Sequence, residues 1–318
     1  MRNFLGFLGI MLCTLSYSQE LYPHNEPASS VPKKVIGLRI FDETYREYGT
    51  QRNMTAARIL YGLTSKISVS ASATISNHHA TTLPSNLVSH THVGNQTLYQ
   101  TGTIQRGLNY PYRFNGFYFY AKYRFLTRDG QNKHFRMAAY GELSTVNAAH
   151  DETEPNLLDD TKGYGGGFIA TYLKNHFSVT LSSGAIIPGK YEETVSDFSG
   201  GEQHTVIEYG KALKYNLSLG YLVYPKTYSN YNQTNINVYL ELMGKSYESA
   251  RVSQDDVAIT PQTDLLLKGN YLEAHPGLQF VIKSNLRIDF ALGFPLINKS
   301  YARFYPLYML GIQRYFFL

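Results

Sequence analysis

The feature that most constrains the fold of this chain is a nine-residue alternation, FYFYAKYRF. Phe117, Phe119, Tyr123 and Phe125 hold four of the odd positions, and hydroxyl-bearing or charged residues hold the even ones. In an extended chain, a period of two places the two classes of side chain on opposite faces. The even face carries two cations, which a dry core does not accept without partners. The stretch therefore predicts a β-strand that separates an apolar from a polar environment.

A second alternating run, over residues 135–144, follows after a short connection. The connection contains Asp129-Gly130, and Asp-Gly between two alternating runs is a strong hairpin signal. A hairpin with one apolar and one charged face fits both a soluble sandwich and a membrane barrel. The rest of the chain distinguishes the two.

Alternation of this kind continues along the chain and predicts twelve strands. They span residues 34–43, 53–63, 66–76, 117–125, 135–144, 163–173, 176–187, 207–223, 235–247, 270–282, 286–294 and 304–318. A barrel of ten or fourteen strands is the alternative, because the connections at 224–234 and 295–303 are of intermediate length.

The lengths of the connections favour a membrane barrel. Long or open connections at 43–52, 77–110, 149–162, 188–206 and 248–269 alternate with short ones at 64–65, 127–132, 174–175 and 283–285. Outer-membrane barrels have long loops on one side, short turns on the other, and an even number of strands. No segment after the first residues approaches the 18 apolar residues of a transmembrane helix. The sequence predicts an all-β fold: a transmembrane antiparallel up-and-down β-barrel of about twelve strands over residues 35–318.

The start of the chain predicts a targeting segment and a tail. Arg2, the apolar run after it and the small residues near Ser18 indicate a signal peptide over residues 1–18. Residues 19–34 contain three prolines and are interpreted as a periplasmic N-terminal tail. The alternative is a small plug that folds into the lumen of the barrel.

Several short segments resemble known outer-membrane proteins. The end, Tyr315-Phe316-Phe317-Leu318, resembles the C-terminal signal of Gram-negative barrels, although the final residue is Leu rather than Phe; this implies the barrel-assembly machinery as a partner. The chain also resembles an uncharacterised family of Gram-negative outer-membrane barrels in the segments 22–27, 76–79, 112–116, 149–152 and 311–317. The resemblance implies a place in the cell outer membrane, among its lipid and lipopolysaccharide. It implies no substrate and no catalytic residue.

The polar faces of the strands predict the residues that line the lumen. These are Arg39, Arg58, Lys122, Arg124, Arg136, Glu142, Glu241, Lys245, Glu273, His275, Arg287 and Asp289. Both signs of charge occur, which argues against a strongly ion-selective wall. Twelve strands lie between the eight-stranded barrels that side chains fill and the porins with a water channel. Two hypotheses follow: a channel or transporter for small polar or amphipathic solutes, and an occluded barrel with a structural or ligand-binding role.

Two of the long connections carry candidate ligands for ions. His78, His79, His90 and His92 fall in the first, and imidazoles are common ligands of Zn, Cu and Ni. Their spacing matches no closed zinc motif, so an ordinary solvated loop is the alternative. The second connection is acidic and suits a divalent cation, lipopolysaccharide or plain solvation; its residues are His150, Asp151, Glu152, Glu154, Asp159 and Asp160.

Other functional classes have little support in the sequence. Cys13 is the only cysteine and lies in the predicted signal peptide, so no thiolate metal site is expected. No cofactor is predicted apart from the divalent metal of the loops. The net charge of +5 is mild, no basic cluster stands out, and no nucleic-acid partner is predicted. An outer-membrane lipid hydrolase is a minor alternative, with no G-x-S-x-G motif to support it.

Overall fold

The computed structural model describes residues 22–318, apart from 80–82, 84–89, 94–95, 100–107, 151, 197–200, 228–229, 231, 260–263 and 301–302. The predicted signal peptide lies outside the described residues. Among the residues that are described, no helix is long and apolar enough to cross a membrane.

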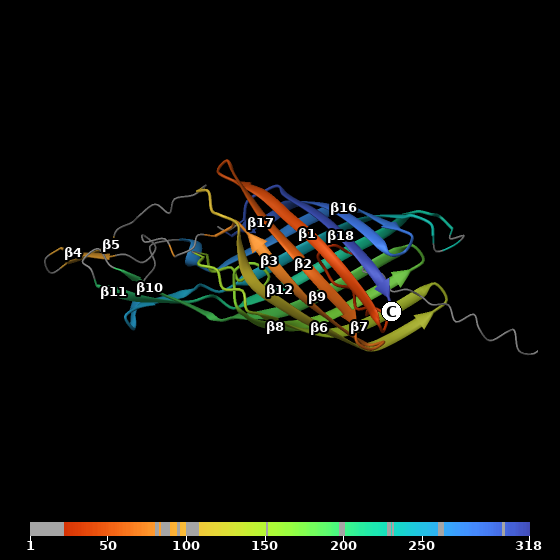
Figure 1. The fold of residues 1–318 in the computed structure, drawn as a ribbon, viewed down its shortest axis with the longest axis horizontal. Coiled ribbons are helices and arrows are strands. Elements are labelled where there is room, and N and C mark those ends of the chain that lie inside the picture. Colours follow the sequence, from red (N-terminus) through yellow and green to blue (C-terminus); the bar gives the residue numbers. More distant parts are fainter. Residues whose placement is uncertain are drawn as a thin grey trace, which may run out of the picture.

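Twelve antiparallel strands close into a barrel in the order β1-β18-β17-β16-β13-β12-β9-β8-β7-β6-β3-β2 (Figure 1). Closure joins the first strand to the last, with Val35 opposite Phe317. The predicted fold class and the count of twelve strands are therefore confirmed. The strands are β1 (Val35–Glu47), β2 (Thr50–Gly62), β3 (Ile67–Ser76), β6 (Arg113–Gly130), β7 (Lys133–Ser144), β8 (Gly163–Lys174), β9 (Phe177–Pro188), β12 (Ala212–Tyr224), β13 (Asn235–Tyr247), β16 (Gly269–Ile282), β17 (Leu286–Lys299) and β18 (Leu307–Phe317).

The strand alternation separates an outer from an inner face. Phe119 and Leu292 are 42% and 40% exposed on the outside, although they are large and apolar. Lys122, Glu241 and Arg287 are at most 3% exposed, although they are charged. Apolar side chains outside and polar side chains inside are typical of a barrel whose outer wall faces lipid. Closure also satisfies the backbone of every strand, which a lipid environment requires.

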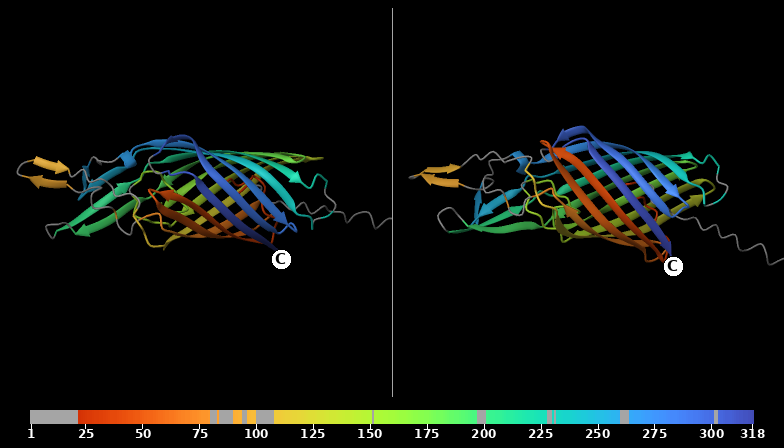
Figure 2. Two further views of the ribbon diagram at one scale, coloured as in Figure 1. Left: turned by 90° about the horizontal axis from the view of Figure 1, so that it is seen from above. Right: turned by 45° about the horizontal axis from the view of Figure 1, so that its top comes forward.

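Short strands extend the barrel at the end opposite the C-terminus (Figures 1 and 2). These strands are β4 (His90–Val93), β5 (Gln96–Tyr99), β10 (Lys190–Ser196), β11 (Glu202–Glu208), β14 (Arg251–Gln254) and β15 (Val257–Ile259). β4 pairs with β5, while the other four form one sheet in the order β10-β11-β14-β15. A one-turn 3₁₀ helix, η1 (Asp264–Leu266), completes this region. The sequence alternation missed these strands, and its strand at 207–223 joins the end of β11 to β12.

One connection is shorter than predicted. β1 and β2 extend to Glu47 and Thr50, which leaves a two-residue turn where a long or open connection at 43–52 was predicted. Both turn residues have positive φ, 44° at Tyr48 and 93° at Gly49, as the hairpin turn that matches the twist of antiparallel strands requires. The Arg52 guanidinium bonds Glu47 beside the turn at 2.6 Å and supports the extended hairpin.

Candidate functional site

Most of the N-terminal segment, Tyr22–Lys34, lies inside the barrel. Side chains from four strands around the barrel form hydrogen bonds with the backbone of the segment. Three of them donate to carbonyl oxygens: Arg287 of β17 to Tyr22 O (2.7 Å), Arg39 of β1 to Pro23 O (2.7 Å) and Lys122 of β6 to Pro27 O (2.6 Å). The fourth, Thr171 of β8, accepts from Ala28 N (2.8 Å). A segment can reach all four strands only from within the lumen. Of the two interpretations of this segment, the structure therefore shows the plug rather than a free tail.

Glu26 provides the main charge of the N-terminal segment. Its carboxylate lies 2.8 Å from Arg58 Nη1 and 3.3 Å from Lys122 Nζ. The two cations project from different strands, β2 and β6, and the pairs are largely shielded from solvent. Burial of unpaired cations is strongly unfavourable. Glu26 therefore supplies the counter-charge that these two lumen residues need.

A second contact fixes the segment to β13 near the middle of the barrel. Glu241 Oε1 accepts from Asn25 N at 2.9 Å, and Glu241 Oε2 accepts from His24 N at 3.1 Å. The same Oε2 lies 2.9 Å from His24 Nδ1. The His24 ring also packs edge-on against His275 of β16, with a centroid distance of 4.7 Å. These contacts order the segment as a specific plug.

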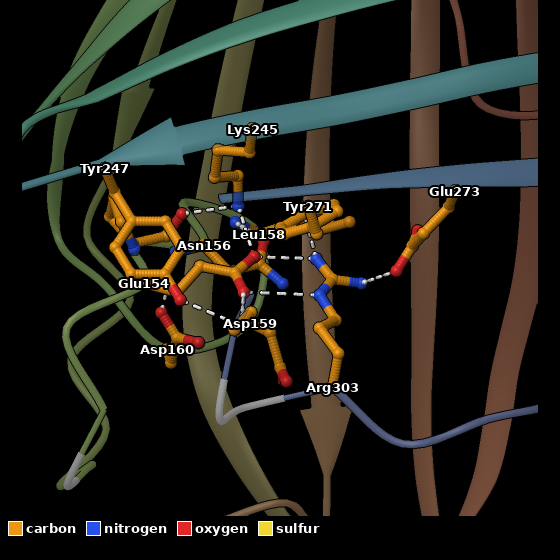
Figure 3. Close-up of polar contacts among 12 residues, drawn as sticks. Glu154, Asn156, Leu158, Asp159, Asp160, Lys245, Tyr247, Tyr271, Glu273 and Arg303 are labelled. Carbon is orange, nitrogen blue, oxygen red and sulfur yellow. Dashed lines mark hydrogen bonds and ion pairs between the residues drawn. The ribbon is translucent and has the colours of Figure 1, made fainter. Parts of the chain in front are cut away.

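The loop between β7 and β8, here called the inward loop (residues 145–162), folds into the other end of the barrel. Figure 3 shows Glu154 held between Lys245 Nζ (2.8 Å) and Arg303 Nη2 (2.7 Å). Burial acts to raise the pKa of the Glu154 carboxyl, but the charges of Arg303 and Lys245 prevail and hold that pKa well below its ordinary value. The loop also buries an apolar anchor, Leu157, which packs in a cluster with Ile186, Ala212, Tyr247 and Tyr271.

Polar contacts lead from the inward loop toward the N-terminal segment. Arg303 Nη1 lies 3.4 Å from Glu273 Oε1, and Glu273 Oε2 lies 2.9 Å from His275 Nε2. His275 in turn contacts His24. The lumen thus contains two inserted pieces of chain, joined by side chains of β16 and by Arg303.

Most of the predicted lumen residues are buried, and the remaining ones are partly buried. Nine of the twelve are at most 7% exposed: Arg39, Lys122, Glu142, Glu241, Lys245, Glu273, His275, Arg287 and Asp289. Asp289 joins two of the cations, at 2.8 Å from Arg287 Nε and 3.6 Å from Arg39 Nη2. Arg58, Arg124 and Arg136 are partly buried. Arg124 donates to Ser65 O and Arg136 pairs with Asp129, both near the short turns.

The four predicted histidine ligands come from two segments of the structure. His78 and His79 follow β3 and lie beside Asp159 of the inward loop. His90 and His92 belong to β4, in the hairpin that projects away from the barrel (Figure 1). The structure thus groups the first two with Asp159, and a metal site shared by all four histidines stays a prediction.

The acidic connection is buried rather than solvated. Glu154, Asp159 and Asp160 are 6%, 1% and 9% exposed. Burial and the charge of Asp159 raise the pKa of Asp160 to about 7, and burial lowers the pKa of His79 to about 3. Asp151 lies outside the described residues.

Some charged residues that the described structure places in the lumen were absent from the predicted set, among them Glu26, Glu154, Arg303 and Lys214. The first three lie outside the strands, so the alternation that identified the other residues does not apply to them. Lys214 lies in β12, where it pairs with Glu142, and was missed. One signal of the missing residues was an imbalance of charge in the predicted lumen set, which holds seven Arg and Lys side chains against four Asp and Glu. Buried charges need partners, so carboxylates from the tail or loops were to be expected.

The fold and the charged interior define a class of protein, a transmembrane β-barrel of the outer-membrane kind. The COG4313 outer membrane channel from Pseudomonas putida F1 matches with a TM-score of 0.52 at 14% sequence identity, over 93% of this chain and 100% of that chain. The NanC porin matches with a TM-score of 0.44 at 9% identity, over 88% of this chain and 99% of that chain. No protein-family model and no curated protein matches the sequence.

Proposed function

We propose that this protein is a channel of the cell outer membrane for small polar or amphipathic solutes. The N-terminal segment and the inward loop set the width of its passage. The observation that carries the proposal is the presence of a peptide segment inside the barrel, bonded to side chains of the wall from β1 to β17. A lumen that accommodates a peptide chain has room for small solutes when that chain moves aside.

The contacts of the segment suit a removable obstruction. Residues 22–34 form no strand with the wall, and the segment continues into β1 at one end only. Its contacts include hydrogen bonds and ion pairs, as between Glu26 and Arg58. Three of its side chains also pack in small apolar clusters of the wall: Tyr22, Ala28 and Val31. If the segment leaves, Arg58, Lys122 and Glu241 face a lumen that water can enter. Water replaces such polar contacts at low net cost.

The shared fold supports the same class of function. The similar structure from Pseudomonas putida F1 is that of an outer membrane channel, and the match covers that chain completely. At 14% identity the likeness concerns the fold alone, so the solute has to be found by experiment.

An occluded barrel with a structural or ligand-binding role is the second candidate. It is favoured by the pairing of the buried charges, for example Asp289 with Arg287 and Arg39. A permanently closed lumen would contain the same ion pairs. We do not propose the lipid-hydrolase alternative, because function has to be argued from a defined site.

The surroundings in the cell follow from the outer face. We expect outer-membrane lipid to cover the apolar band that includes Phe119 and Leu292. Lipopolysaccharide is expected around the end that carries the longer loops. We expect the barrel-assembly machinery to act on the last strand, which ends at Phe317.

Liposome swelling with uncharged sugars of increasing size tests the proposal. Three proteins are compared: the mature chain, a variant that lacks residues 19–30, and the matched control Glu208→Gln, which changes an exposed ion pair of β11. We expect slow swelling with the mature chain and the control, and faster swelling with the truncated variant. Absence of swelling with all three proteins, when the truncated barrel is shown to be folded, would favour the occluded barrel.

A further inference from the structure

Two histidines after β3 meet an aspartate of the inward loop at the end of the barrel opposite the C-terminus. His78 Nδ1 bonds Asp159 Oδ2, and His79 Nε2 lies 3.8 Å from the same oxygen. One ligand atom from each of the three residues lies within 4.8 Å of the other two. The side chains of His78, His79 and Asp159 are only 9%, 13% and 2% exposed. The fold thus gathers three metal-binding groups, although the two histidines lie about 80 residues from the aspartate in sequence.

Both imidazole rings carry a buried nitrogen without a hydrogen-bond partner. His78 Nε2 and His79 Nε2 are inaccessible to solvent and accept or donate no hydrogen bond within the described residues. Native structures leave few buried polar atoms unpaired, and each such atom calls for an explanation such as an ion or a water. Two of them in adjacent rings indicate a site that accepts a ligand.

The chemistry of the three groups selects the ligand. We propose that His78, His79 and Asp159 bind a divalent first-row transition metal ion such as Zn²⁺ or Cu²⁺. Two imidazoles and one carboxylate suit these ions, whereas Mg²⁺ and Ca²⁺ favour shells made of oxygen. Three protein ligands leave at least one position of the metal for water. A cavity of about 60 Å³ beside the residues, lined also by Glu43 and Glu152, has room for that water.

The surroundings orient the carboxylate. Asn115 Nδ2 donates to Asp159 Oδ1 at 2.9 Å and to Asp159 O at 2.8 Å. Partners of this kind fix the direction of a metal ligand, and their loss commonly lowers metal affinity about 10–100-fold. The inward loop itself is anchored by Glu154, so the aspartate is held in place before an ion arrives. A bound ion would tie the end of β3 to the inward loop. The site therefore adds to the proposed channel without depending on it.

Isothermal titration calorimetry of the untagged mature chain in detergent, washed free of metal, tests this site. Zn²⁺, Cu²⁺ and Mg²⁺ are titrated into the wild type, the double variant His78→Ala/His79→Ala and the matched control His90→Ala/His92→Ala. We expect one equivalent of Zn²⁺ or Cu²⁺ per wild-type chain and no response to Mg²⁺. His78→Ala/His79→Ala should bind these ions at least about 100-fold more weakly than the wild type, which exceeds the usual effect of losing a residue that only orients a ligand. The control His90→Ala/His92→Ala should bind them as tightly as the wild type.

A second measurement keeps the test valid if the double variant does not fold. The X-ray absorption spectrum of the Zn²⁺-loaded wild type should show two imidazoles and oxygen ligands, and Asp159→Asn should weaken binding. Absence of Zn²⁺ and Cu²⁺ binding by the wild type would overturn the proposal. Equal binding by the wild type and His78→Ala/His79→Ala, or a loss confined to His90→Ala/His92→Ala, would overturn it as well. All of these readouts are independent of conductance.

Discussion

Glu26 and Lys122 form an ion pair across the lumen, with the carboxylate of the N-terminal segment 3.3 Å from the ammonium group of β6. Arg58 of β2 shares the same carboxylate at 2.8 Å. One residue of an irregular tail thus joins two strands of the wall, and the tail becomes part of the folded barrel. This relationship leads to the first prediction.

Glu26→Gln should release the N-terminal segment and destabilise the barrel. The substitution keeps the shape of the side chain but removes the negative charge that contacts both Arg58 and Lys122. Removal of one partner of a buried ion pair costs about 3–5 kcal/mol. Urea unfolding in lipid vesicles, followed by circular dichroism, measures the loss. Glu208→Gln, which changes an exposed pair, should unfold like the wild type; equal stability of the Glu26 variant would argue against a buried role for this carboxylate.

A disulfide should form between the segment and the wall when cysteines replace Asn25 and Ser182. Asn25 Oδ1 lies 2.7 Å from Ser182 Oγ of β9. The predicted mature chain contains no cysteine, so the introduced pair is the only source of a disulfide. Mass spectrometry of proteolytic fragments after mild oxidation detects the bond, with each single-cysteine variant as a control. Two free thiols after oxidation would place the segment elsewhere.

Protonation of Glu154 should loosen the inward loop. Its pKa is lower in the folded protein than in the unfolded chain, because Arg303 and Lys245 outweigh the effect of burial. The contribution of this carboxylate to stability is therefore complete above the ordinary pKa of about 4.5 and is lost progressively as the pH falls from there through the lower pKa of the folded protein. Hydrogen exchange of residues 152–162 should be slow at pH 7 and should become faster, after correction for intrinsic rates, only as the pH falls well below that ordinary value. Glu154→Gln should exchange fast already at pH 7, and slow exchange in that variant would contradict the role of the carboxylate.

Cysteines at positions 119 and 122 should react with different reagents. Phe119 is exposed on the outer wall and Lys122 is buried in the lumen, three residues further along β6. In lipid vesicles, Phe119→Cys should react with a lipid-soluble maleimide. Lys122→Cys should react more slowly with that reagent and gain reactivity with a water-soluble one when residues 19–30 are removed. Identical labelling of the two positions would contradict the assignment of the faces.

Alternation predicted the barrel well because it reports a local property. Each strand residue faces either lipid, like Phe119, or the lumen, like Lys122. The polarity of each residue therefore indicates directly which face of the strand it occupies. The same signal failed beyond the membrane. The turn at Tyr48-Gly49 is set by backbone conformation, with positive φ at both residues, and side-chain alternation does not report it.

The site could be predicted only in part, because its parts come from distant segments. Arg39 was predicted as a lumen residue from its own strand, but its partner in the lumen, Pro23 of the N-terminal segment, lies in a stretch with no periodic pattern. The histidine pair was also predicted, yet its third member is Asp159, which lies 81 residues beyond His78. Pairing of loop residues depends on how the loops fold into the barrel mouth, which periodicity does not report.

Conductance of single barrels in a planar lipid bilayer tests the central claim most directly. The mature chain and the variant that lacks residues 19–30 are recorded in the same salt, after both are shown to be folded barrels. The account predicts small or rare conductance steps for the mature chain and larger, lasting steps for the truncated variant, because the wall that bonds Glu26 and His24 is then open to water. Identical traces from the two proteins, whether both are silent or both conduct equally, would contradict the claim that the N-terminal segment sets the passage.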